Sequence, residues 1–308
     1  MKSKVHSFRD SALRLLSAFL LTLIAACSQV SPGEVNARAV PARADGDPLA
    51  TCCQRPEIYP RPLVALLEPF APAIGRTIAA MVWRPGTLLS HPDATNEIVA
   101  SLRPLDIIAV SNKGRMSGHT IPGLFSHVAI YLGNEKQLRA AGIWDYPQVR
   151  KHREEIRKGY LFVEADQKGV HLSTTELTLD ADAIAHLRPK SLSLRRKREA
   201  LVGFYSRLGM AFDFYFDLET KDCTFCTELA NTVMPELRLP VRKVYGRDLI
   251  LPDEVVANTI RGRTGLAFIR YYRSNKDDWA SLGSSVLAQD LKPAWAPPKV
   301  TTARAADR

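Results

Sequence analysis

Three short runs rich in β-branched and aromatic residues constrain most strongly how this chain folds. They are residues 105–111 (LDIIAVS), 127–132 (HVAIYL) and 160–165 (YLFVEA), each bounded by Gly, Pro or Asn. Such runs are typical of strands. Two helical patterns follow: an amphipathic one over residues 193–208 (SLRRKREALVGFYSRL), and a shorter one over residues 224–234 (TFCTELANTVM) with its apolar side chains on one face. We therefore expect strands and helices to pack together in one domain.

The segments on either side of this domain are expected to be peripheral. Between residues 63 and 83, apolar side chains recur at near-helical spacing and are interrupted by two prolines, which predicts a kinked helix or a helix pair. We expect residues 61–98 to be a structural cover of the main domain, residues 99–290, rather than a lid over substrate. Residues 291–308 are rich in Pro, Ala and charge and are expected to form a disordered tail.

The start of the chain resembles the signal peptide of a bacterial lipoprotein. Residues 1–14 are cationic, and residues 15–26 form an apolar run too short to span a bilayer comfortably. The motif IAAC, which ends at Cys27, is similar to the lipobox, whose cysteine is acylated after the leader is cut. Ser28 then implies sorting to the outer membrane, and residues 27–60 would be a tether on its periplasmic face. The alternative is an ordinary secretory leader with a chance cysteine.

The net charge and the number of cysteines limit which ligands and which disulfides we expect for this chain. The formal net charge of +10 favours anionic surfaces, but the sequence has no zinc-finger spacing, no aromatic-basic repeat and no Gly-rich phosphate loop. We therefore expect no nucleic-acid partner, no metal and no cofactor. Five cysteines are too few for a disulfide scaffold. In an oxidising periplasm Cys52 and Cys53 could pair with other cysteines, since a bond between neighbours is uncommon.

Cys226 has the local setting of a reactive thiol. A thiol with an ordinary pKa of about 8.5 supplies little thiolate at neutral pH, unless a helix N-terminus or an imidazole stabilises the anion. Cys226 lies in the opening turn of the helix expected over residues 224–234, where Asp222 or Thr224 can cap the start. The base must come from elsewhere in the chain. The candidates are His91, His119, His127, His152, His171 and His186.

Two polar residues on predicted strands stand out. His127 opens an apolar strand, so that its ring is held at the strand start. Glu164 interrupts the β-forming run over residues 160–165, and burying a carboxylate costs several kcal/mol unless it is hydrogen bonded. Glu164 therefore either points to solvent or has a partner such as His127, and His127 is either a structural residue or a base.

Taken in order, these motifs resemble a known family. FSHVAIYLG around His127, LDII around Asp106, FVEA around Glu164, DFYFD at residues 213–217 and FCTEL around Cys226 are similar to the permuted papain-like cysteine hydrolases of the YiiX/YaeF type. These are relatives of the NlpC-type cell-wall peptidases and of lecithin-retinol acyltransferases. The resemblance implies an α+β fold in which a small antiparallel sheet packs with helices. It also implies Cys226 as nucleophile, His127 as base and Glu164 as the residue that orients the imidazole.

Two positions depart from the family pattern. The family usually has Gly where this chain has Leu105, which affects only a turn. Cys223 lies three residues before Cys226, and a disulfide between them would silence a hydrolase. The same pair is formally a C-x-x-C redox motif, but thioredoxin-like proteins carry that motif early, inside a βαβ unit that is missing here.

The resemblance and the leader together predict a membrane-anchored periplasmic cysteine hydrolase that cleaves an amide through an acyl-enzyme. Peptidoglycan stem peptides are the favoured substrate. The alternatives are a lipid or N-acyl amide or ester, as hydrolase or acyltransferase, a thiol-disulfide protein, and a lipoprotein that binds a partner without catalysis.

Overall fold

The structure is a computed structural model that describes residues 48–50 and 52–296. The predicted leader, the predicted lipidation site Cys27, most of the tether and residues 297–308 lie outside the described residues.

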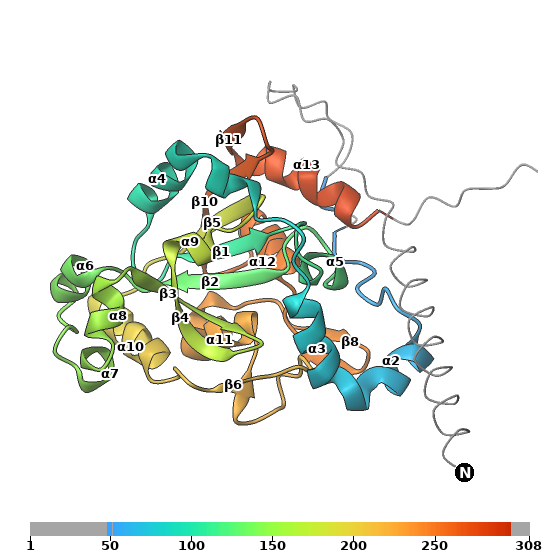
Figure 1. Ribbon diagram of the computed structural model, residues 1–308, viewed down its shortest axis with the longest axis horizontal. Coiled ribbons are helices and arrows are strands. Elements are labelled where there is room, and N and C mark those ends of the chain that lie inside the picture. Colours follow the sequence, from blue (N-terminus) through green and yellow to red (C-terminus); the bar gives the residue numbers. More distant parts are fainter. Residues whose placement is uncertain (1–47, 51, 297–308) are drawn as a thin grey trace, which may run out of the picture. The chain divides into compact units, whose positions relative to one another are not determined.

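A seven-stranded sheet forms the centre of the domain (Figure 1). Its order is β11-β10-β5-β1-β2-β3-β4, and every neighbouring pair is antiparallel. The strands are β1 (Ile107–Ser111), β2 (His127–Tyr131), β3 (Tyr160–Asp166), β4 (Gly169–Thr174), β5 (Ala183–Pro189), β10 (Leu266–Ser274) and β11 (Trp279–Leu282). Two short ribbons pair β6 (Ala211–Phe212) with β7 (Cys223–Thr224), and β8 (Arg242–Val244) with β9 (Arg247–Leu249).

Helices precede, connect and follow these strands. On the N-terminal side are α2 (Arg61–Leu67), η1 (Glu68–Phe70), α3 (Ala71–Ala80), η2 (Thr87–Ser90) and α4 (Pro92–Ser101). The connecting helices are α5 (Ser117–Thr120), α6 (Glu135–Ala140), α7 (Pro147–Arg150), α8 (Arg153–Arg157), α9 (Thr175–Thr178) and α10 (Leu194–Tyr205). Those of the C-terminal part are α11 (Cys226–Val233), η3 (Pro235–Leu237), α12 (Pro252–Ile260) and α13 (Ser284–Ala294).

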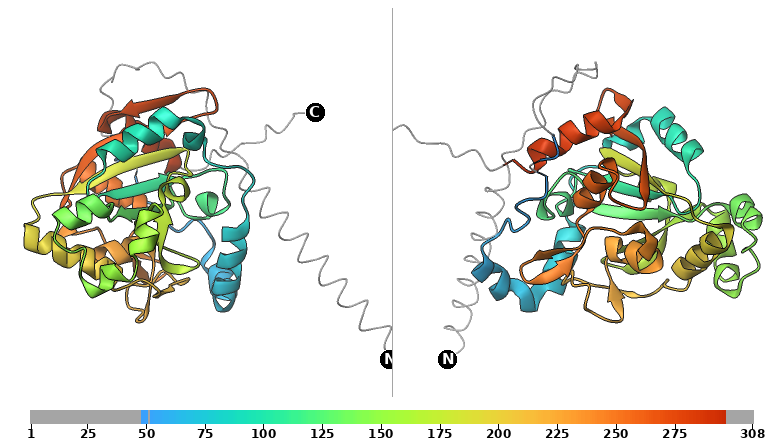
Figure 2. Two further views of the ribbon diagram at one scale, coloured as in Figure 1. Left: turned by 60° about the vertical axis from the view of Figure 1, so that its left-hand side comes forward. Right: turned by 180° about the vertical axis from the view of Figure 1, so that it is seen from behind.

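The central strands are buried on both faces of the sheet. In β1, Ile107 and Ala109 belong to the larger apolar core, whereas Ile108 and Val110 belong to a second core on the opposite face. Side chains of α10 to α13 fill the first core, and side chains of α4 and η2 fill the second. The view from behind in Figure 2 shows α12 in front of the sheet. This two-sided burial explains why the predicted strands are continuous apolar runs.

The α+β fold expected from the resemblance is confirmed, with a larger sheet than expected. The three predicted strands, the helix pair α2–α3 and the amphipathic helix α10 are all present, and the run LAFIRYY at residues 266–272, which the sequence also predicts as a strand, lies in β10. Strands β4, β5 and β11 were not expected. The β5 run AIAHLRP contains the polar residues His186 and Arg188. They interrupt the apolar pattern of a buried strand, and the sequence does not show that they share a buried partner.

That partner is Asp106, which lies at the end of β1 far from His127. Asp106 and His186 are both fully buried, and the Asp106 carboxylate accepts hydrogen bonds from His186 Nε2 at 2.7 Å and from the Arg188 guanidinium. Ile107 pairs with Ile130 whereas Val110 pairs with His127, so Asp106 stands at the opposite end of the strand pair. The motif residue Asp106 therefore joins β1 to β5.

The turn before β1 explains the departure at Leu105. Leu105 has a φ of 77°, the left-handed region that glycine enters without cost. The family's usual glycine suits this backbone. In this chain the Leu105 side chain is completely buried in the larger core, and that burial offsets backbone strain of about 1–3 kcal/mol.

Both ends of the described chain are more tightly packed than expected. Near the end of the predicted tether, Leu49, Cys52 and Cys53 are buried, and the two cysteines form a disulfide with each other rather than with other cysteines. Helix α13 continues past the predicted boundary at residue 291 because Leu291 is buried in the core. Trp295 is also buried, and its indole donates to Asp253.

Candidate active site

Helix α11 begins at Cys226, so the predicted nucleophile is its first residue. The residue before it, Phe225, is the N-cap, and its backbone N–H donates to the Glu228 carboxylate at 3.3 Å. The sequence predicted a cap from Asp222 or Thr224 instead. Thr224 is held in β7, where it pairs with Phe212, so the helix starts two residues later than expected. The backbone N–H of Cys226 has no intrahelical acceptor, as is general for the first turn of a helix.

His127 and Glu164 come together across two neighbouring strands. His127 opens β2, Glu164 lies in β3, and the His127 Nε2 atom is 2.7 Å from Glu164 Oε2. The Glu164 side chain is 12% exposed and that of His127 is 24% exposed. Of the two possibilities left open by the sequence, Glu164 therefore takes the bonded one.

The Cys226 thiol interacts with the same imidazole. Helix α11 packs on β2 and β3, and the interaction with Cys226 raises the pKa of His127. Because Nε2 faces Glu164, Nδ1 is the ring nitrogen left for the thiol. The structure thus brings together the three residues that the sequence selected, in the order thiol, imidazole and carboxylate.

The surroundings of His127 and Glu164 shift the pKa values of both side chains. Burial alone lowers the pKa of His127, but its hydrogen bonds and charge interactions with Cys226 and Glu164 raise that pKa well above the usual 6.5. Burial alone raises the pKa of Glu164, yet His127 and a hydrogen bond from Ser173 bring it down to about 2. The site therefore favours an imidazolium beside an ionised carboxylate, the state that stabilises a neighbouring thiolate.

The sequence interpretation did not place two residues beside Glu164, although it counted one of them, His171, among the candidate bases. The Ser173 hydroxyl donates to Glu164 Oε1, and His171 Nε2 stands 3.9 Å from the same oxygen. Both lie on β4, which forms a hairpin with β3 and pairs His171 with Glu164. The sequence feature that could have located them is the alternation in the run GVHLST after the Gly169 turn. In a strand this alternation places His171 and Ser173 on one face.

The remaining histidines are occupied elsewhere. His186 bonds Asp106, His152 bonds Glu155, His91 bonds the carbonyl of Asn275 and His119 bonds the carbonyl of Lys113. Among the described residues there is no cluster of His, Cys, Asp and Glu that could hold a metal ion.

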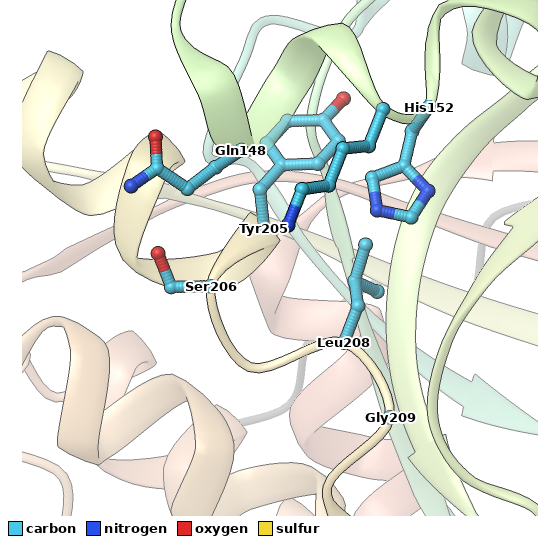
Figure 3. A pocket seen from close by; sticks show the side chains of 7 residues that line it. Gln148, His152, Tyr205, Ser206, Leu208 and Gly209 are labelled. Carbon is cyan, nitrogen blue, oxygen red and sulfur yellow. The ribbon is translucent and has the colours of Figure 1, made fainter.

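A surface pocket of about 550 Å³ lies away from the three site residues, between α10 and the α7–α8 segment (Figure 3). None of Cys226, His127 and Glu164 lines it. Its lining residues are Gln148, Lys151, His152, Tyr205, Ser206, Leu208 and Gly209.

The charge on Glu164 predicts a specific pH dependence of stability. Its pKa is about 2 in the folded protein against a usual value of 4.5, so its contribution is fully present above pH 4.5 and is lost as the pH falls toward 2. The difference corresponds to about 3 kcal/mol. We expect Glu164→Gln to be less stable than wild type in urea unfolding at pH 7, with the gap narrowing below pH 4.5 and closing only at about pH 1.5, below the folded-state pKa.

Glu154→Gln is the matched control, because the Glu154 side chain is 77% exposed. It should follow the wild-type curve at every pH. A stability gap for Glu164→Gln that does not change with pH would contradict the charge pairing.

Comparison with known proteins agrees with this geometry. Residues 101–291 match the family described as permuted papain-like amidase enzyme, YaeF/YiiX, C92 family, and this range contains all three site residues. No curated protein and no solved structure matches the chain. Since the matched residues make up well over half of the sequence, the chain belongs to the permuted papain-like amidase family and is a cysteine hydrolase.

Proposed function

We propose that this protein is a membrane-anchored periplasmic amidase that cleaves peptidoglycan stem peptides through an acyl-enzyme at Cys226. The observation that carries the chemistry is the setting of the His127 ring, which is bonded to the Glu164 carboxylate and whose pKa is raised by its interaction with the Cys226 thiol.

In the acylation step, the Cys226 thiolate attacks the carbonyl carbon of the scissile amide and forms a C–S bond. The carbonyl electrons move to oxygen, and the backbone N–H of Cys226 at the start of α11 donates to that oxyanion. When the oxyanion collapses, the C–N bond breaks and the His127 imidazolium gives its proton to the leaving amine. The products are a free amine, a thioester on Cys226 and a neutral imidazole.

In the deacylation step, neutral His127 takes a proton from water as its oxygen attacks the thioester carbonyl. The C–S bond breaks, the acyl group leaves as a carboxylic acid, and the thiolate–imidazolium pair is restored. Glu164 does not exchange a proton in either step. Its bond to Nε2 fixes the ring plane and stabilises the imidazolium, as the third residue of a triad does.

The proposed compartment supports the choice of substrate. Acylation of Cys27 would hold the domain at the outer membrane, with the cell wall as the nearest amide-rich polymer. The residues between Cys27 and the buried Leu49 would let the domain reach away from the bilayer, since an extended chain spans about 3.3 Å per residue.

One observation favours a second substrate class, lipid acyl esters or N-acyl amides. In the part of the chain that the structure describes, the stretch Arg61–Ala80 is long and apolar enough to cross a bilayer, with a mean hydropathy of 1.3, and none of its residues is buried. Leu66 and Phe70 are 69% and 60% exposed. Such a surface suits contact with lipid.

The redox alternative is less well supported by the geometry. Cys223 and Cys226 are both free thiols, and burial raises the pKa of Cys223, which leaves it a poor thiolate. Cys226, in contrast, is the thiol that contacts His127.

Incubation with muropeptides and, separately, with phospholipid vesicles distinguishes these functions. We expect mass spectrometry to detect cleaved stem peptides with wild type and with Cys223→Ser, and none with Cys226→Ser, because only Cys226 forms the thioester. Release of fatty acid alone would support the second substrate class. Activity that needs both thiols would support the redox alternative, and product formation by Cys226→Ser would contradict a thiol nucleophile.

Anchoring is tested separately in a bacterial host. Palmitate label should enter the full-length protein and be absent from Cys27→Ser, since acylation needs that thiol. Equal labelling of the two proteins would contradict acylation at Cys27, and a wild-type protein without label would contradict the anchor.

A further inference from the structure

Asp253 is a fully buried carboxylate that the proposed chemistry does not use. It is the second residue of α12, and its side chain has no exposed surface. Burying a carboxylate costs several kcal/mol unless hydrogen bonds compensate. The groups that donate hydrogen bonds to Asp253 therefore indicate its role in the fold.

Two of these donors are consecutive backbone amides just before His127. Asp253 Oδ2 accepts from the N–H of Leu124 and Oδ1 accepts from the N–H of Phe125, both at 2.7 Å. The next residue, Ser126, donates its N–H to the Val110 carbonyl at 3.0 Å, and β2 then begins at His127. Asp253 thus fixes the backbone immediately before the imidazole.

The approach of the carboxylate is close enough to require glycine at the preceding position. Gly123 has a φ of 110°, and a Cβ atom there would lie 2.3 Å from Asp253 Oδ2. This contact and the two amide bonds show that the loop backbone wraps directly onto the carboxylate.

Lys113 holds the carbonyl side of the same loop. Its ammonium donates to the carbonyls of Gly118 at 2.5 Å and Gly123 at 3.2 Å. Its positive charge also interacts with the Asp253 carboxylate. The segment between β1 and β2 is therefore tied by its carbonyls to a cation and by its amides to an anion.

We propose that Asp253, together with Lys113, is a positioning residue of the amidase that holds His127 between Cys226 and Glu164 by fixing the loop over residues 113–125. The inference rests on the proposed role of His127. The third donor to Asp253, the Trp295 indole at 2.7 Å, comes from the end of α13 rather than from this loop. Trp295 therefore provides a control at the same carboxylate.

The test compares Asp253→Asn with Trp295→Phe. An asparagine of the same shape presents an NH₂ group to one of the two loop amides, which leaves that amide unpaired. We expect Asp253→Asn to slow the alkylation of Cys226 by iodoacetamide at pH 7 by about 10-fold or more, because small displacements of paired groups have effects of that size. NMR titration should show the pKa of His127 falling toward 6.5. Trp295→Phe should lower the melting temperature but leave the alkylation rate and the His127 pKa unchanged.

Lys113→Met is the second variant if Asp253→Asn does not fold. It releases the carbonyl side of the loop while Asp253 remains, and it should slow alkylation and lower the His127 pKa in the same direction. A folded variant, Asp253→Asn or Lys113→Met, with the wild-type rate and His127 pKa would overturn the proposal. Equal losses in Trp295→Phe would overturn it too, because they would indicate a general loss of stability. A wild-type protein that is not alkylated at Cys226 would contradict the proposed function, while the His127 pKa comparison would still decide the positioning role.

Discussion

The His127 ring has to meet a thiol and a carboxylate at once, and most of the surrounding structure serves that requirement. Glu164 is fixed by the antiparallel hairpin β3–β4 and by the hydroxyl of Ser173. Cys226 is fixed because α11 packs on β2 and β3 and starts at the thiol itself. A slip of one residue in β2 or β3 would turn a side chain to the other face of the sheet and break the set.

Three of the buried carboxylates in the described residues, Asp106, Glu164 and Asp253, have different roles in this fold. Asp106 joins β1 to β5 through His186 and Arg188, and the hydrogen bonds from these two partners lower its pKa against the effect of burial. Glu164 is paired with the His127 imidazole, so its negative charge raises the pKa of that ring. Asp253 is satisfied mainly by N–H groups, and burial raises its pKa to about 6. All three carboxylates are buried, so the depth of burial does not distinguish them. They differ in the groups that donate hydrogen bonds to them.

The sequence predicted features that a local residue pattern encodes. It missed contacts between residues that only the folded chain brings together. A helix with Cys226 in its opening turn and a strand that begins at His127 are local features, and the ordered motifs identified the family. Strand β5 was missed because His186 and Arg188 look like surface residues until Asp106 is seen beside them. Ser173 and Asp253 were missed because their partners depend on strand register and on a contact across 128 residues of chain between Asp253 and Phe125. Contacts of that kind leave no periodic signal.

The contact between Cys226 and His127 is tested most directly by the pKa of the His127 ring in the folded protein. NMR titration of the wild type should give a value well above 6.5, since the thiolate and Glu164 both favour the protonated ring. In Cys226→Ala the value should fall, because one of the two groups that raise it has been removed. An ordinary pKa in the wild type, unchanged in Cys226→Ala, would show that the two side chains do not interact and would contradict the account.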